Sequence, residues 1–154
     1  GDTSVGRSEF SGNRVGRCAS AWLNLDYTAV QHMTFADNVF DWYYNPGGVS
    51  AHKDPPFGTG VRLQDCVFSG NTWVLGKADN QPWAVCGALG GSGNTFSGET
   101  WTKESGSVST CAMPFTDTTY TDCRFYLPKP VTFPSSASGT GCYFQNGHIG
   151  GTFR

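Results

Sequence analysis

The residues best suited to bind a ligand gather in one irregular segment, from Asp41 to Gly58. It holds three consecutive aromatic and three consecutive polar side chains: Trp42, Tyr43, Tyr44, His52, Lys53 and Asp54. Aromatic rings stack on sugar faces, and the polar side chains can hydrogen-bond hydroxyl groups. Proline and glycine exclude regular structure here, and long loops on rigid scaffolds often carry binding sites. We predict a binding loop; the alternative is that Trp42 and Tyr43 fold back to cover the open side of a coil.

Trp73 and Trp101 are candidates for the same kind of contact. Both lie just after polar turn residues, so exposed rings there would form an aromatic face that recognises a glycan or a partner protein. Packing against the scaffold, or in an oligomer interface, is the alternative, and it is the commoner role of any single tryptophan.

Motifs for a metal or a cofactor are missing from the sequence. The three histidines show no His-x-x-x-His spacing, and the sequence contains no phosphate loop, no Gly-x-Ser-x-Gly elbow and no dinucleotide fingerprint. The six cysteines form no Cys-x-x-Cys pair and are Cys18, Cys66, Cys86, Cys111, Cys123 and Cys142. Their even number admits up to three disulfides, but we favour small buried thiols that fill a narrow interior. We expect neither metal nor cofactor.

Composition narrows the chain to an all-β class. Among 154 residues there are 21 glycines, 14 % are aromatic and only 14 % are charged, which is typical of short strands joined by frequent turns. The net charge of -2 gives no electrostatic reason to bind nucleic acid. No apolar run approaches the roughly 18 residues that span a bilayer.

A short unit recurs along the chain: a small or apolar residue, any residue, phenylalanine, and then a polar turn. Its copies are Met33–Asn38, Cys66–Asn71, Cys123–Phe125 and Cys142–Asn146, with variants at Phe10–Asn13 and Asn94–Gly98. The phenylalanines of this unit, Phe35, Phe68, Phe96, Phe125 and Phe144, follow one another at steps of 19 to 33 residues. A constant unit with insertions of variable length is typical of a solenoid.

Strand alternation assigns the repeated residues to the interior. Because residues i and i+2 of a strand face the same side, Cys66 points with Phe68, and like residues of stacked copies lie roughly 4.8 Å apart. We predict a right-handed parallel β-helix of about five or six coils. The phenylalanines expected inside are Phe35, Phe68, Phe96, Phe125 and Phe144. A β-sandwich is the alternative, although it gives no reason for the unit to recur once per coil.

Asp65 and Asp122 are the candidate catalytic pair. Each stands directly before an inner cysteine, and Gly93 takes the matching place on the coil between them, so the carboxylates would face outward roughly 10 Å apart. That separation approaches the one that inverting glycoside hydrolases use. A solvated aspartate beside a turn is the commoner interpretation. By the same alignment Cys123 and Cys142 would stand on adjacent coils, close enough for a disulfide if the geometry allows.

Three Phe-x-x-Asn segments, at residues 10–13, 35–38 and 68–71, resemble the repeat of β-helical adhesins. Coils rich in threonine, glycine, asparagine and aromatic residues are also similar to those of phage tailspikes, whose long loops contact bacterial glycans. This resemblance to right-handed parallel β-helix repeat proteins covers about residues 10–144. It implies one β-helix domain over residues 1–154, as a fragment or tip of a larger protein.

The function that we expect is binding. The chain would be a surface or virion module that recognises a bacterial or host glycan or receptor, located outside the cell, on its surface or on a virion. The alternative is a polysaccharide-degrading hydrolase or lyase on the same scaffold. Because terminal coils leave strand edges unpaired, we also expect a homotrimer or further domains of a longer chain. Neither a nucleic acid nor a membrane span is expected.

Overall fold

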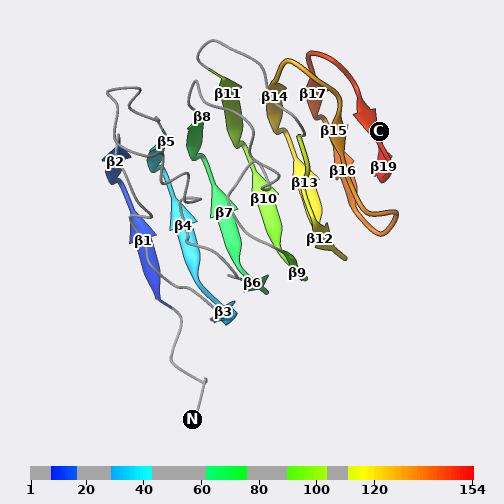
Figure 1. Ribbon diagram of the computed structural model, residues 1–154. Helices are drawn as coiled ribbons and strands as arrows, with labels where there is room; N and C mark the ends of the chain where they lie inside the picture. The colour runs from blue at the N-terminus through cyan, green and yellow to red at the C-terminus, as the bar shows by residue number, and fades with distance from the viewer. Residues whose placement is uncertain (1–7, 17–28, 43–61, 76–89, 104–110) are drawn as a thin grey trace, which may run out of the picture.

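The computed structural model describes residues 8–16, 29–42, 62–75, 90–103 and 111–154. These residues form short strands that pair only in parallel, and Figure 1 shows them stacked in rungs from the N-terminal to the C-terminal end. The chain is therefore a right-handed parallel β-helix, as the repeat predicted. Among the described residues, no helix is long and apolar enough to cross a membrane.

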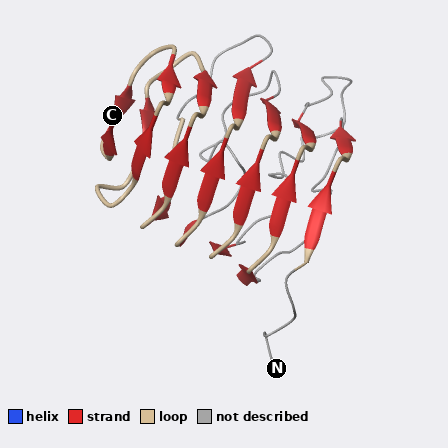
Figure 2. Ribbon diagram, turned by 180° about the vertical axis from the view of Figure 1, so that it is seen from behind, coloured by secondary structure: helices blue, strands red, loops and turns tan. Residues whose placement is uncertain are grey.

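The rungs build three long sheets and one short sheet. The first sheet, seen from behind in Figure 2, stacks β1 (Glu9–Ser11), β4 (Thr34–Ala36), β7 (Val67–Ser69), β10 (Thr95–Ser97), β13 (Thr119–Thr121), β16 (Ser138–Thr140) and β19 (Thr152–Phe153). The second stacks β2 (Arg14–Gly16), β5 (Val39–Trp42), β8 (Thr72–Leu75), β11 (Thr100–Lys103), β14 (Arg124–Tyr126) and β17 (Tyr143–Phe144). The third stacks β3 (Ala29–Gln31), β6 (Arg62–Gln64), β9 (Gly90–Ser92) and β12 (Phe115–Thr116), and β15 (Val131–Thr132) pairs with β18 (His148–Ile149).

Two columns of stacked aromatic rings fill the interior. The column of the first sheet is Phe10, Phe35, Phe68, Phe96 and Tyr120, and the column of the second sheet is Phe40, Trp73, Trp101, Phe125 and Phe144. From Phe35 and from Trp73 onward, neighbouring rings lie nearly parallel, with centroids 4.5 Å apart for Phe68 with Phe96 and for Trp101 with Phe125. The first pair of each column, Phe10 with Phe35 and Phe40 with Trp73, is tilted. All five predicted phenylalanines pack in or against this core, but Phe125 and Phe144 belong to the second column. The predicted interior phenylalanines are therefore confirmed, and they divide between the two columns.

The coils shorten toward the C-terminal end. The step between paired residues of the first sheet falls from 33 residues, at Phe35 to Phe68, to 14 residues, at Gly139 to Phe153. Gly139 follows Tyr120 in the column, and the ring of Phe153 occupies the space in which a Cβ of Gly139 would stand. Rings of Phe133, Phe144, His148 and Phe153 meet there, so aromatic side chains fill the narrow end of the solenoid.

A polar ladder runs through the turn that joins the first sheet to the second. Its residues, one per rung, are Asn13, Asn38, Asn71, Glu99, Cys123 and Cys142. The backbone N–H and the Nδ2 of Asn38 both donate to Oδ1 of Asn71, at 2.9 and 3.0 Å, and Asn13 donates to Asn38 in the same way. Each amide thus satisfies polar backbone groups that the narrow turn buries.

Glu99 follows Asn71 in the ladder, accepts the hydrogen bonds that Asn71 donates, and is fully buried. Its Oε1 accepts from Nδ2 of Asn71 at 2.9 Å and from Nε1 of Trp73 at 3.3 Å, while its Oε2 accepts from the N–H of Asn71. Burial disfavours the charged carboxylate and raises the pKa of Glu99 to about 7, against the opposing effect of these donors.

The aromatic columns predict that substitutions at two neighbouring residues of β7 change the free energy of unfolding by very different amounts. Phe68→Ala should lower the free energy of unfolding by about 3–5 kcal/mol, because it leaves a cavity between stacked rings. Val67 is 42 % exposed on the outer side of the same strand, so Val67→Thr should change the free energy of unfolding by less than about 0.5 kcal/mol. Urea unfolding of the two variants tests this, and equal losses would contradict the assigned orientation of the strand.

Glu99 predicts an unusual dependence of stability on pH. Because the folded pKa is raised, the folded chain binds more protons than the unfolded chain between about pH 4.5 and 7. Stability from this group is therefore fully present below about pH 4.5 and falls by on the order of 3 kcal/mol as the pH rises through 7. Urea unfolding at several pH values should show this fall, and Glu99→Gln should remove it. An unchanged profile in Glu99→Gln would disprove the assignment.

Candidate ligand-binding site

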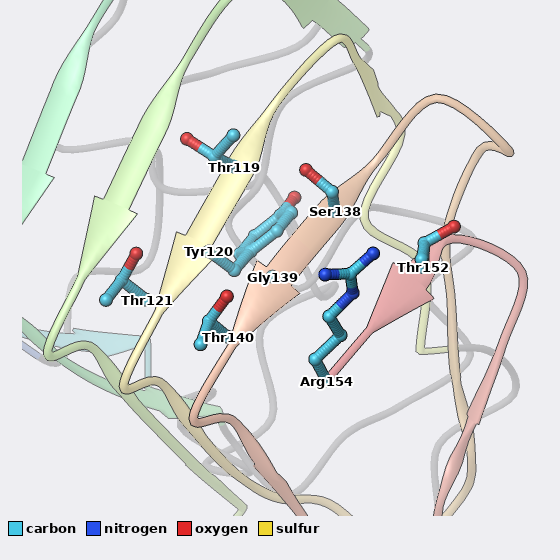
Figure 3. A pocket seen from close by; sticks show the side chains of 8 residues that line it. All are labelled: Thr119, Tyr120, Thr121, Ser138, Gly139, Thr140, Thr152 and Arg154. Carbon is cyan, nitrogen blue, oxygen red and sulfur yellow. The ribbon is translucent and has the colours of Figure 1, made fainter.

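A hollow of about 310 Å³ opens on the outer face of the first sheet, at the narrow end of the solenoid. Its walls are side chains of β13, β16 and β19 and of the residue after β19: Thr119, Thr121, Ser138, Thr140, Thr152 and Arg154, with Tyr120 and Gly139 between them. Figure 3 shows the hydroxyl groups in rows across the strands and the guanidinium of Arg154 turned toward them.

The register of the sheet sets the spacing of these groups. Thr119, Ser138 and Thr152 pair along one column, and Thr121 and Thr140 along another. Groups in a column are therefore about 4.8 Å apart, and the columns are about 6.7 Å apart along a strand. Alternation forces this arrangement, because the residue between the columns points inward.

The hollow offers hydrogen bonds and one positive charge. Each hydroxyl can donate one hydrogen bond and accept two, and a guanidinium donates through a planar fork that matches oxyanions and vicinal hydroxyls. The side chains that line the hollow include no carboxyl, imidazole or thiol group. This set can bind a ligand with many hydroxyl groups, but it holds no side chain that commonly transfers a proton near neutral pH.

A second feature, the tyrosine platform, lies on the outer face of the second sheet and consists of Tyr126 and Tyr143. The rings are 37 % and 52 % exposed, and their centroids are 5.6 Å apart. Arg124 pairs with Tyr143 across the strands, and it alternates with Tyr126 along β14, so all three face outward. Exposed rings beside a flexible cation are the usual mixture at recognition surfaces.

One short turn separates the two features. Only Gly141 and Cys142 stand between Thr140 in the hollow and Tyr143 in the platform. The backbone bond from the N–H of Tyr143 to the carbonyl of Cys123, at 2.9 Å, holds this turn on the preceding rung. The hollow and the platform thus meet at a single rigid corner of the solenoid.

The tryptophans that the sequence suggested as ligand contacts are inside the fold. Trp73 is 1 % exposed and Trp101 is 0 % exposed, and their rings stack in the second aromatic column. Rings without exposed surface cannot contact a ligand, so we assign both to the core. The physical reason is alternation: each is the second residue after a ladder residue, Asn71 or Glu99, and therefore faces inward.

The predicted binding loop lies outside the described residues. This holds for Tyr43, Tyr44, His52, Lys53 and Asp54. The backbone of Trp42 ends β5, and its side chain lies outside the description as well. Their role as ligand contacts stays a prediction.

Asp65 and Asp122 do not share a column. Asp65 lies in the turn between the third and first sheets, in line with Gly93, whereas Asp122 lies in the turn between the first and second sheets. About five residues of strand, at about 3.3 Å each, separate the two turns, so the pair is roughly 15–20 Å apart rather than 10 Å. That distance is too long for a pair of carboxylates that flanks one glycosidic bond.

Both aspartates have a conformational role instead. Their φ angles are +50° and +51°, the left-handed region that the turns require at this position. Glycine takes the equivalent place on neighbouring rungs, at Gly93 and Gly141, and Asp tolerates this region better than most residues do.

We did not predict the residues of the hollow and of the platform as a binding site from the sequence. Their signal is the alternation Thr119-Tyr120-Thr121 followed by Ser138-Gly139-Thr140, in which outward hydroxyls flank an inward residue. Comparisons of the chain with protein-family models, with curated proteins and with solved structures find no match. Function therefore has to follow from the site itself.

The turn conformation predicts how Asp122 responds to substitution. Asp122→Val should lower the free energy of unfolding by about 1–2 kcal/mol, because a β-branched side chain is strained at positive φ. Asp122→Gly should be close to neutral, since glycine relaxes the strain while the chain gains freedom when unfolded. Thermal unfolding measures both variants. If Asp122→Gly were as destabilising as Asp122→Val, the conformational role would be excluded.

Proposed function

We propose that this chain is an extracellular binding module that recognises a carbohydrate at its narrow end. The observation that supports it best is the hollow of five hydroxyl groups and one guanidinium, next to two exposed tyrosine rings. Sugars present rows of hydroxyl groups on one side of a ring and apolar C–H groups on another. The corner of the solenoid offers a partner for each.

The two features divide the work of recognition. In the hollow, the two columns of hydroxyls and Arg154 supply directional bonds to sugar hydroxyl groups or to an acidic substituent. On the platform, Tyr126 and Tyr143 supply apolar area that loses little side-chain entropy on binding. A ligand of two or more sugar units would reach both features across the turn at Gly141.

The biological setting that we propose is a surface fibre, an adhesin or a tailspike-like protein, with a polysaccharide or a glycosylated receptor as partner. Rigid β-helices with a binding surface near one end suit such fibres. The outer edges of β1 and β2 have no strand partner among the described residues, which favours attachment to further copies or to further domains at that end.

A glycan array probed with the full chain tests this function. We expect binding to one family of bacterial or host glycans. Tyr143→Ala and Arg154→Ala should each weaken binding at least tenfold, about 1.4 kcal/mol, with nearly unchanged melting temperatures because both side chains are exposed. Arg62→Ala is the matched control, since Arg62 is exposed on the third sheet and should leave binding unchanged.

Three outcomes would contradict the proposal. If the chain bound no glycan, the proposed function would be wrong. If Tyr143→Ala and Arg154→Ala both left glycan binding intact, the proposed site would be wrong. Release of reducing ends or of unsaturated sugars from a polysaccharide panel would replace the binding module by a hydrolase or a lyase.

A further inference from the structure

Cys123 and Cys142 occupy the same turn position on adjacent rungs. The pairing of Arg124 with Tyr143 fixes this register, and the N–H of Tyr143 donates to the carbonyl of Cys123 at 2.9 Å. Their sulfur atoms take the place of the asparagine amides in the polar ladder, and each lies 3.5 Å from a carbonyl oxygen of the preceding rung, that of Phe96 or that of Tyr120. Both sulfur atoms therefore point into the same narrow column.

The two thiols also interact with each other. Cys123 is fully buried, whereas Cys142 is partly exposed, so only the second sulfur is reachable from solvent. A hydrogen bond from the thiol of Cys123 favours the thiolate of Cys142 and lowers the pKa of Cys142 below its usual value. The corner thus holds an accessible sulfur that ionises readily, with a second thiol directly behind it.

Neither Cys66 nor Cys111 stands beside another cysteine that the structure describes. Cys66 lies in the turn between the third and first sheets, between Met33 and Asn94 in its column. Cys111 is buried beside the bridge of Ala112 with Thr132, so its column neighbour on the following rung is Val131. Among the residues that the structure describes, Cys123 and Cys142 alone form a stacked pair.

We propose that Cys123 and Cys142 are a disulfide-forming pair that cross-links the last two complete turns of the polar ladder. Neighbouring parallel strands put their Cα atoms about 4.8 Å apart, within the range of about 4.4–6.8 Å that a disulfide spans. The cross-link lies beneath the corner at which the hollow and the tyrosine platform meet. It does not depend on what that corner binds.

The oxidant is a disulfide, either a small molecule such as oxidised glutathione or the disulfide of an oxidoreductase. The thiolate of Cys142 attacks one sulfur of this disulfide and releases one thiolate. The thiol of Cys123 then loses its proton to solvent, and its sulfur attacks Sγ of Cys142, which expels the second thiolate. Two protein thiols are oxidised to one disulfide, and one external disulfide is reduced to two thiols.

Peptide mapping of the full chain tests the bond directly. Trypsin cleaves after Arg124 and so separates Cys123, in peptide 104–124, from Cys142, in peptide 125–154. After incubation of the folded chain with oxidised glutathione, we expect these two peptides to stay joined without reduction. Cys111 shares the first peptide, so the mapping is repeated in Cys111→Ser, where the joined pair should persist.

Thermal unfolding supplies a second readout. Oxidation should raise the melting temperature of the wild-type chain by several degrees, because the cross-link restricts the unfolded chain. Cys142→Ser should abolish this shift. Cys66→Ser is the matched control, since the Cys66 thiol makes the same kind of carbonyl contact, to Val30 at 3.5 Å, and should leave the shift intact. Separate peptides after oxidation, or a shift that persists in Cys142→Ser, would overturn the proposal.

Discussion

The structure depends on one constraint: each rung pairs in register with the rung below it, so that equivalent residues stand about 4.8 Å apart along the solenoid. Such stacking favours like residues at equivalent positions, because a ring, an amide or a hydroxyl group then contacts a group of the same kind on the next rung. The aromatic columns, the asparagine ladder and the outward hydroxyls all follow from it. The turns obey it too, since their left-handed residues also stack, as Asp37 does with Gly70.

The same constraint explains why a flat outer face can carry a site. Inward rings support the strands of the first sheet from beneath, and at Gly139 of β16 the ring of Phe153 takes this place, so the outward side chains have little freedom to change their spacing. Toward the C-terminal end, fewer residues separate consecutive strands of the first sheet. The hydroxyls of β13 and β16, with Thr152 and Arg154, line the hollow at that end, and the turn through Cys142 connects them to exposed tyrosines.

Much of the fold could be predicted from the sequence, but not the identity of the columns. The unit that signals an inward aromatic, a buried turn residue followed by any residue and a ring, occurs after both turns. Cys66-Val67-Phe68 follows one turn and Cys123-Arg124-Phe125 follows the other, and local spacing does not distinguish them. Asn71-Thr72-Trp73 has the same pattern, so Trp73 could have been assigned to the core. The hollow could not be predicted, since it depends on pairing between coils whose lengths differ by insertions of arbitrary size.

A crystal structure of the chain with the best-bound oligosaccharide of the glycan array is the most direct test of the proposed recognition corner. The account predicts sugar density in the hollow, with hydroxyl groups within hydrogen-bond distance of Thr140 and Arg154 and a ring face over Tyr143. Density elsewhere, with the hollow and the tyrosines left in contact with water alone, would contradict it.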